Sequence, residues 1–239
     1  MTCRRVVGVL LMLWLTSGAP AEAACPDVAG AQGAFSSRTN TERFAFVQSH
    51  LAHEARATRT WTWVWFGING AVSVGSFATL PLTPRHLRPE NVVGGIASAL
   101  SAATYFVFPV SVDAPVNPTQ ADAPSCEELA RAEQALVTGA ASETFGRSAF
   151  SHILVFSLAA VPGLVLGLGY HDWTGAALLF GVGAALGEVG IWTQPTGVIA
   201  ALDDYRAGRL GRVAGASVRW NVAPFVISRG GGVSAGIQF

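Results

Sequence analysis

The possible folds of this chain are constrained most by two long apolar runs, which follow each other almost directly. Residues 149–170 contain no Asp, Glu, Lys or Arg, and residues 173–192 contain only one, Glu188. Each run approaches the roughly 20 residues that an α-helix needs to cross a bilayer core. The connection "YHDW" leaves room only for a tight turn, so we expect an antiparallel transmembrane hairpin here.

A second hairpin is predicted over residues 61–110, with spans at 61–82 and 92–110. Trp61, Trp63 and Trp65 mark its entry, because indole rings favour the headgroup level. Only 13% of the chain's residues are charged, against about 25% in soluble domains. The predicted fold class is therefore an all-α membrane protein with four transmembrane helices arranged as two hairpins.

Residues 1–23 have the organisation of a secretory signal peptide. Arg4 and Arg5 precede an apolar stretch, and Ala21 and Ala23 give a small-x-small cleavage site. An acylated Cys25 and an uncleaved anchor are the alternatives. In all three cases the segment after the signal is exported across the membrane.

Export leaves two cysteines in the mature chain, Cys25 and Cys126, once Cys3 is removed with the signal. In an oxidising compartment a lone pair of cysteines usually forms a disulfide. Neither cysteine has His or Cys neighbours at metal-ligand spacing, so we expect a Cys25–Cys126 disulfide and no metal site.

Two polar segments are predicted to lie in the periplasm. Residues 24–60 contain a helix that starts at the capping box of Thr39 and Glu42, and residues 111–148 contain one that starts at Ser125 and Glu128. The short loop with Arg85 and Arg88 suits the cytoplasm by the positive-inside rule.

The charges of the C-terminal part argue against this orientation. This part carries five arginines, and four spans would place them on the periplasmic side. These are Arg206, Arg209, Arg212, Arg219 and Arg229. An odd number of spans would move them to the cytoplasm.

Small residues recur at four-residue spacing in the second hairpin. They form the pairs Gly163 with Gly167 and Gly183 with Gly187. Because lipid gives no hydrophobic drive for helix association, close backbone approach over such residues replaces it. We therefore expect these glycines at the helix–helix contact, and Asn69 as an interhelical hydrogen-bond donor.

Glu188 needs a partner, since an ionisable group at this depth costs on the order of 1–3 kcal/mol unless it is paired or wetted. It lies about 6 Å from the end of its span at about 1.5 Å per residue. An antiparallel hairpin brings His152 to the same level, with Arg147 one turn further out. The pair is either a proton-relay or ligand-binding carboxylate or a polar clamp that fixes the hairpin register. We prefer the clamp, because one carboxylate and one histidine make no complete catalytic set.

Several chemistries are excluded or disfavoured. The chain has no lysine, which excludes Schiff-base chemistry and a P-loop. The net charge of zero gives no sign of a nucleic-acid partner. His50 and His53 lack a third metal ligand nearby. We predict no cofactor, no metal, no catalytic residue and no enzymatic activity.

Residues 193–239 are predicted to form an amphipathic segment at the membrane interface, followed by a short β-hairpin. Val218, Trp220 and Val222 alternate before the turn at 229–232, and Val233, Ala235 and Ile237 alternate after it. An isolated hairpin is marginally stable. It should therefore rest on the helices or add to the sheet edge of a protein partner.

The chain resembles a group of uncharacterised bacterial multi-pass envelope proteins in "RTWTWVWFGINGA", "CEELARAE", "GLVLGLGY", "GEVGIWTQPTG", "DDYRAG" and "VAPFVISRGGGVSAGIQF". The resemblance implies architecture only, because no activity is assigned to such proteins.

The sequence therefore predicts a multi-pass protein of the bacterial cell membrane, with a periplasmic mature N-terminus and the lipid bilayer around its spans. We expect an envelope scaffold or assembly subunit. The alternative is a small-solute or proton-linked transport component that uses Glu188 and His152.

Overall fold

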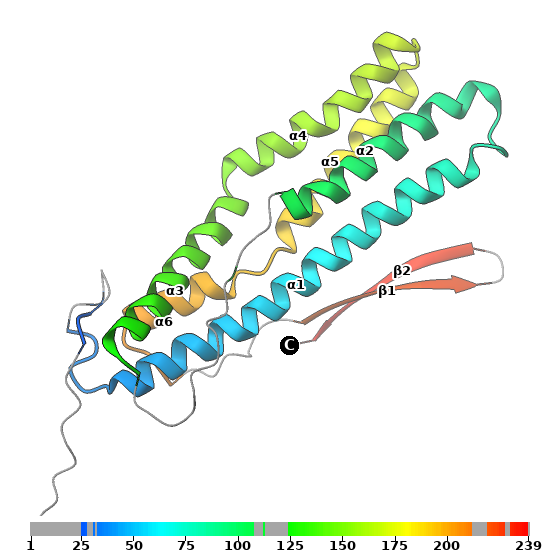
Figure 1. Cartoon of the computed structure of the whole chain (residues 1–239). Helices are drawn as coiled ribbons and strands as arrows, with labels where there is room; N and C mark the ends of the chain where they lie inside the picture. Colours follow the sequence, from blue (N-terminus) through cyan, green and yellow to red (C-terminus); the bar gives the residue numbers. More distant parts are fainter. Residues whose placement is uncertain are drawn as a thin grey trace, which may run out of the picture.

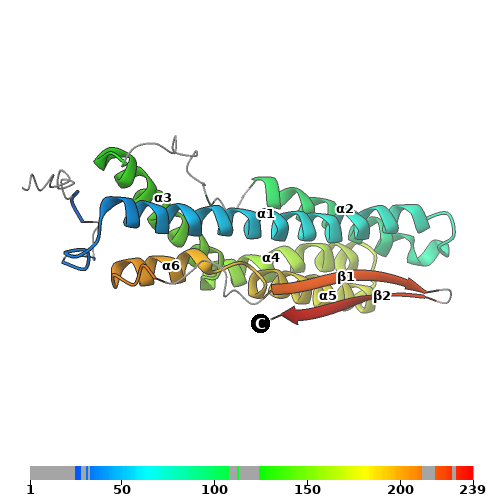
Figure 2. The same cartoon turned by 90° about the horizontal axis from the view of Figure 1, so that it is seen from below.

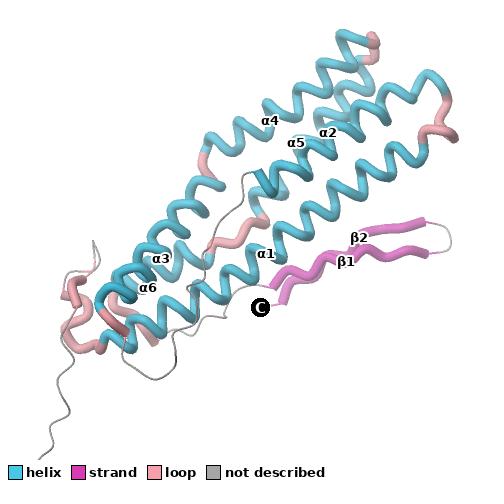
Figure 3. Tube along the Cα trace, in the orientation of Figure 1, coloured by secondary structure: helices cyan, strands magenta, loops and turns pink. Residues whose placement is uncertain are grey.

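The computed structural model describes residues 25–27, 31, 33–107, 112 and 124–211, and the backbone of 219–227 and 230–238. The predicted signal peptide lies outside these residues. The helices are α1 (Asn40–Thr79), α2 (Arg88–Val107), α3 (Cys126–Gly146), α4 (Ala149–Leu164), α5 (Trp173–Trp192) and α6 (Gly197–Arg206). A 3₁₀ turn, Arg85–Leu87, precedes α2, and a π-helical turn, Val165–Gly169, follows α4. The strands are β1 (Arg219–Ile227) and β2 (Gly230–Gln238) (Figures 1 and 3).

The 40-residue helix α1 runs along both halves of the helical body (Figures 1 and 2). Its N-terminal half packs with α3 and α6, and we call residues 25–60 together with α3 and α6 the head. Its C-terminal half packs against α2, while α4 packs against α5. We call residues 61–107 and 149–192 the apolar bundle. The predicted polar helix and first span are thus one uninterrupted helix.

The head has an ordinary hydrophobic core. It comprises Cys25, Ala31, Phe35, Phe44, Phe46, Val47, Leu51, Leu129, Ala132, Leu136, Ala140, Val198, Ala201, Leu202 and Tyr205. These side chains come from the N-terminal loop and from α1, α3 and α6. The head therefore folds in the way that water-exposed helical domains fold, with its apolar side chains inside.

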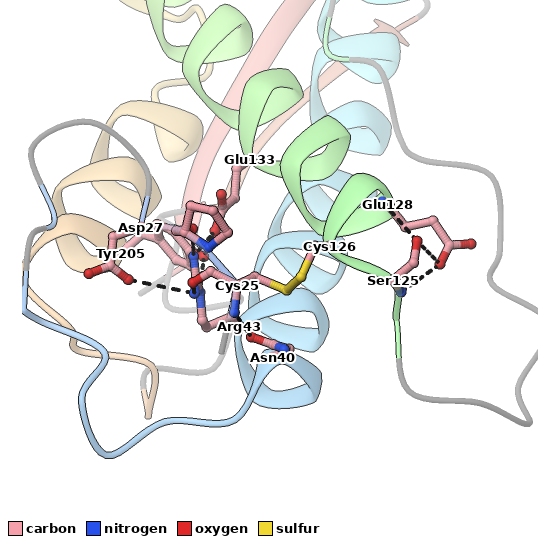
Figure 4. Close-up of a disulfide and its surroundings, with 10 residues drawn as sticks. Cys25, Asp27, Asn40, Arg43, Ser125, Cys126, Glu128, Glu133 and Tyr205 are labelled. Atoms are coloured by element: carbon pink, nitrogen blue, oxygen red, sulfur yellow. Dashed lines mark hydrogen bonds and ion pairs between the residues drawn. A yellow bond between two sulfur atoms is a disulfide. The ribbon is translucent and has the colours of Figure 1, made fainter. Parts of the chain in front are cut away.

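Two features predicted from the sequence start the head helices. Thr39 and Glu42 form a capping box at α1, and Ser125 and Glu128 form one at α3, which confirms both predictions. The Cys25–Cys126 disulfide joins residues 101 apart and ties the N-terminal loop to the start of α3 (Figure 4). The backbone N–H bonds of the Ser125 box lower the pKa of Glu128.

The apolar bundle has the opposite distribution. Apart from Phe145 near the end of α3, every exposed large hydrophobic side chain of the described helices lies between Trp63 and Val107 or between Phe150 and Trp192. Two helical stretches, Ala149–Gly169 and Trp173–Arg206, are long and apolar enough to cross a membrane by length and composition. The helical part is therefore all-α with two candidate membrane-spanning helices.

The environment of the apolar face of α6 differs from the expectation. The sequence predicts an amphipathic segment at the membrane interface here, whereas α6 buries Val198, Ala201, Leu202 and Tyr205 in the head. Their i, i+3, i+4, i+7 spacing is common to an interfacial helix and to a core helix. Here the apolar face packs on α1 and α3 instead of lipid.

The residues after position 211 end in two antiparallel strands. In their antiparallel register, Trp220 of β1 lies opposite Ile237 of β2, and Val222 lies opposite Ala235. Among the described residues, β1 and β2 pair only with each other, so each strand keeps one unpaired edge.

The four predicted packing glycines lie against the facing helix of the hairpin. A Cβ on Gly163 would lie 3.1 Å from the carbonyl oxygen of Ala176, and one on Gly183 would lie 3.4 Å from the Cβ of Ala159. On Gly167 it would overlap the Trp173 ring, and on Gly187 it would overlap Val155. Close backbone approach of α4 and α5 thus depends on small residues. The helix α4 continues past Pro162 and becomes π-helical three residues later.

The disulfide should stabilise the head by about 2–4 kcal/mol, a typical contribution for a bond closing a long loop. We expect Cys25→Ala with Cys126→Ala to lower the melting temperature in detergent. Reductant should lower the melting temperature of the wild-type protein and leave that of the double variant unchanged. Equal melting temperatures of the wild type with and without reductant would contradict this role.

Candidate functional site

The head contains a buried arginine that joins three segments to α1. The side chain of Arg43 is 2% exposed. Its Nη1 donates to the carbonyl of Cys25 (3.3 Å), and its Nη2 donates to the carbonyl of Pro26 (3.1 Å) and to Glu133 Oε1 on α3 (2.6 Å). Its Nε donates to the hydroxyl of Tyr205 on α6 (3.1 Å). Arg43 therefore holds the N-terminal loop, α3 and α6 together (Figure 4).

Tyr205 and Phe35 complete this Arg43 cluster. The Tyr205 hydroxyl donates to Glu133, and burial raises the pKa of Tyr205 so that the phenol stays protonated. The guanidinium carbon of Arg43 lies 4.5 Å from the centre of the Phe35 ring, a cation–π contact. Every member is satisfied by another member, which is the signature of a structural clamp.

The structure brings the predicted pair of the second hairpin together. His152 Nδ1 lies 3.0 Å from Glu188 Oε1 and 2.9 Å from Oε2. The two side chains are 30% and 23% exposed, respectively. The pair crosses from α4 to α5 close to the head.

Two other predicted members of this cluster lie elsewhere. Arg147 does not bond Glu188 in the described structure. Its Nη2 donates to the carbonyls of Trp192 (2.9 Å) and Gln194 (3.0 Å) at the end of α5. Asn69 Nδ2 donates to the carbonyl of Trp65, one turn back in its own helix, and not across helices as predicted. A helix carbonyl within reach satisfies an asparagine amide as well as a partner helix does.

A second polar group occupies the level where the head meets the apolar bundle. Glu143 on α3 has a fully buried side chain whose two oxygens accept from the backbone N–H groups of Val198 (3.3 Å) and Ile199 (3.0 Å). These N–H groups belong to the first turn of α6, where such donors have no partner within the helix. Burial, with a contribution from the charge of Glu54, raises the pKa of Glu143 to about 7.

Glu54 approaches the same turn of α6 from α1. A Cβ at Gly197 would overlap the Glu54 carboxylate, so this carboxylate lies directly against the glycine that opens α6. Glu54 is buried, and its Oε1 lies 3.0 Å from His53 Nδ1. Two buried carboxylates thus converge on one helix start.

Four buried polar atoms have no hydrogen-bond partner among the described residues. They are Thr58 Oγ1, Arg147 Nε, Ser148 Oγ and Gln194 Nε2. Together with Glu54 and Glu143, these four residues form what we call the polar junction. Buried polar atoms are nearly always satisfied, so such a concentration at one level of the molecule marks a candidate binding region.

Tryptophans line the bundle side of the junction. Trp61 Nε1 and Trp65 Nε1 both donate to Thr193 Oγ1, at 3.3 Å and 3.1 Å. Trp65 is buried, whereas Trp63 is 56% exposed. Of the three residues predicted at the headgroup level, Trp63 alone has its ring largely outside, and Trp65 is a packing residue.

No group of three or more His, Cys, Asp or Glu side chains in the described part of the chain could hold a metal ion. The chemistry that the site supports is proton binding and hydrogen bonding. In comparisons with family models, curated proteins and solved structures, nothing matches this chain.

Sequence reasoning missed the Arg43 cluster and the junction. Glu54, Glu133 and Glu143 are charged residues on helices with exposed polar faces. Their signal was their position on the apolar face of each helix: Glu133 and Glu143 share the face of Leu136 and Ala140, and Glu54 shares the face of Val47 and Leu51. A charge on an apolar face calls for a buried partner.

Removing the charge of Arg43 alone should lower the free energy of unfolding far more than removing the charges of both Arg43 and Glu133. Arg43→Met leaves Glu133 buried without its cation, and we expect a loss of about 3–5 kcal/mol. Adding Glu133→Leu should restore much of the stability, because no uncompensated charge remains. Denaturant unfolding of the head signal measures both variants. Additive losses in the double variant would contradict the clamp.

The His152–Glu188 pair should behave as a hydrogen-bonded clamp between α4 and α5. We expect Glu188→Gln to keep the melting temperature in detergent within a few degrees, because an amide can still bond His152. Glu188→Leu should lower it, with a loss of about 1 kcal/mol for the broken bond. The exposed Glu127→Leu is the control. Wild-type stability in Glu188→Leu would rule out the clamp.

Proposed function

We propose that this protein is a four-span integral membrane protein of the bacterial envelope whose disulfide-linked head lies in the periplasm. In this arrangement the second half of α1, α2, α4 with its π-helical turn, and α5 cross the bilayer. The N-terminal segment acts as the export signal. The head and the C-terminal strands then form the working surface of a scaffold or assembly subunit.

The observation that carries the proposal is the reversal of hydrophobic burial along α1. In the head, Phe44, Val47 and Leu51 point into a core, while beyond Trp61 large apolar side chains such as Val74 and Phe77 are exposed. The same reversal occurs between α3 and α4, and between α6 and α5. Contiguous exposed apolar surface of this extent is unfavourable in water and favourable in lipid.

The packing of α6 also supports an even number of spans. Because α6 and α3 pack on the same half of α1, the chain returns to its starting side after α5. The Cys25–Cys126 disulfide suits an oxidising compartment on that side. Arg206 and Arg209 then lie in the periplasm despite their charge.

The C-terminal strands support a contact role. Each of β1 and β2 keeps one unpaired edge among the described residues, and open edges are templates for pairing with another chain. Strand addition to a partner's sheet would satisfy these groups. No enzymatic step is proposed.

A specific observation favours the second candidate, a proton-linked transport component. The His152–Glu188 pair combines a carboxylate with a histidine beside the apolar surface of α4 and α5. Ionisable groups in such positions often lie on ion or proton pathways.

Deleting residues 216–239 should separate the two functions. For a scaffold, we expect proteins that co-purify in mild detergent to be lost, while the disulfide and the melting temperature of the helical part stay unchanged. For a transporter, proteoliposomes should show a proton or solute flux that Glu188→Gln abolishes and the deletion leaves intact. A full-length chain that stays soluble without detergent would overturn the membrane assignment itself.

A further inference from the structure

We propose that Glu54 and Glu143 form a proton-binding site in the head, in which one proton resides on Glu143 and thereby controls how firmly α6 docks on α1 and α3. Both carboxylates belong to the head. The site therefore does not depend on the role of the C-terminal strands or of the His152–Glu188 pair.

The geometry places two buried carboxylates at one helix start. Glu143 accepts the N–H groups of Val198 and Ile199, and Glu54 lies against Gly197, the residue before them. Two carboxylates that share a buried site resist ionising together, because like charges repel strongly where water is excluded. Burial is the largest cause that raises the pKa of Glu143, the charge of Glu54 adds to it, and the N–H bonds from Ile199 and Val198 oppose it. A proton on Glu143 removes both the cost of burying its charge and the repulsion.

Among the described residues no cationic side chain bonds Glu143 directly, whereas Glu54 has His53 beside it. The described charged and titratable groups that act on Glu143 are Glu54, whose own partner is His53, and Arg147. Arg147 directs its Nη2 to the carbonyls of Trp192 and Gln194 instead of to a carboxylate. From α6, Glu143 receives only backbone donors.

Unpartnered polar groups next to each carboxylate provide the second, independent observation. Thr58 follows Glu54 by one turn of α1, between Glu54, which touches Gly197, and Trp61, which bonds Thr193. It is 4% exposed, and its hydroxyl has no partner in the described structure. Because these α1 residues share a helix face, Thr58 faces the connection between α5 and α6.

Gln194 occupies the corresponding place beside Glu143. Its side-chain amide packs on Gly146, one turn of α3 beyond Glu143, and its Nε2 is likewise without a partner among the described residues. Buried donors at such sites are commonly satisfied by ordered water. Thr58 and Gln194 thus each present an unused polar group about one helical turn from a carboxylate of the pair.

The sign of the resulting pH dependence follows from the direction of the shift. The pKa of Glu143 rises from an ordinary 4.5 to about 7 in the folded protein. The folded head therefore binds more protons than the unfolded chain in this interval, and its stability falls as pH rises from about 4.5 to about 7. Docking of α6, which leads into the C-terminal strands, weakens in the same direction.

Infrared difference spectroscopy of the full-length protein in detergent tests the site directly. Wild type should show the C=O stretching band of a protonated carboxylic acid that disappears between pH 6 and pH 8 and shifts in D₂O. Glu143→Gln should abolish this band. Glu54→Gln should keep the band but move its midpoint to lower pH, because the like charge is gone. Glu127→Gln, an exposed carboxylate on the same helix, should leave it unchanged.

Hydrogen exchange reports the coupling to α6. After correction for the intrinsic pH dependence, exchange at Val198 and Ile199 should accelerate from pH 6 to pH 8 in the wild type and not in Glu143→Gln. Three results would overturn the proposal: no titrating acid band in the wild type, a band that survives both substitutions, or exchange with the same pH dependence in both proteins. A band lost only in Glu54→Gln would overturn the assignment of the proton to Glu143.

Discussion

The guanidinium of Arg43 is the group on which the head depends. It has been removed from water, so each of its donors must find an acceptor inside the protein, and those acceptors come from three segments far apart in the sequence. A buried charge of this kind is costly when a partner is missing and specific when all are present. It therefore fixes where the N-terminal loop, α3 and α6 meet α1, while the surrounding apolar core supplies most of the stabilisation.

The general architecture was accessible from the sequence because it rests on local patterns. The tight turn at "YHDW", the capping residues Thr39 and Ser125, and the cysteine pair each act over short distances or by elimination. The His152–Glu188 contact followed from one helical hairpin and a rise per residue. Interpretation failed where two environments share a pattern: the apolar face of α6 fits a core as well as an interface, and Asn69 can bond its own helix as well as another.

The polar junction could not be predicted, for a different reason. Glu54, Glu143 and Gln194 come from three segments whose relative positions are set by the packing of α1, α3 and α6. No spacing rule brings 54, 143 and 194 together. Gly197 was a weak local sign, because a glycine at the first position of a helix permits close approach of another group. Which group approaches depends on the tertiary structure.

Continuity of α1 links the two halves of the molecule mechanically. The helix passes from the head core through the level of Glu54 and Thr58 to Trp61 and Trp65, which bond Thr193 at the end of α5. The connection between α5 and α6 is thus held by α1 on its bundle side and by both carboxylates on its head side. The proposed proton on the Glu54–Glu143 pair would sit directly beside this short connection. The His152–Glu188 contact lies at the same end of α5, with Glu188 five residues before Thr193. One helix end therefore meets both the polar junction and the contact that joins α4 to α5, although the carboxylates bond different partners.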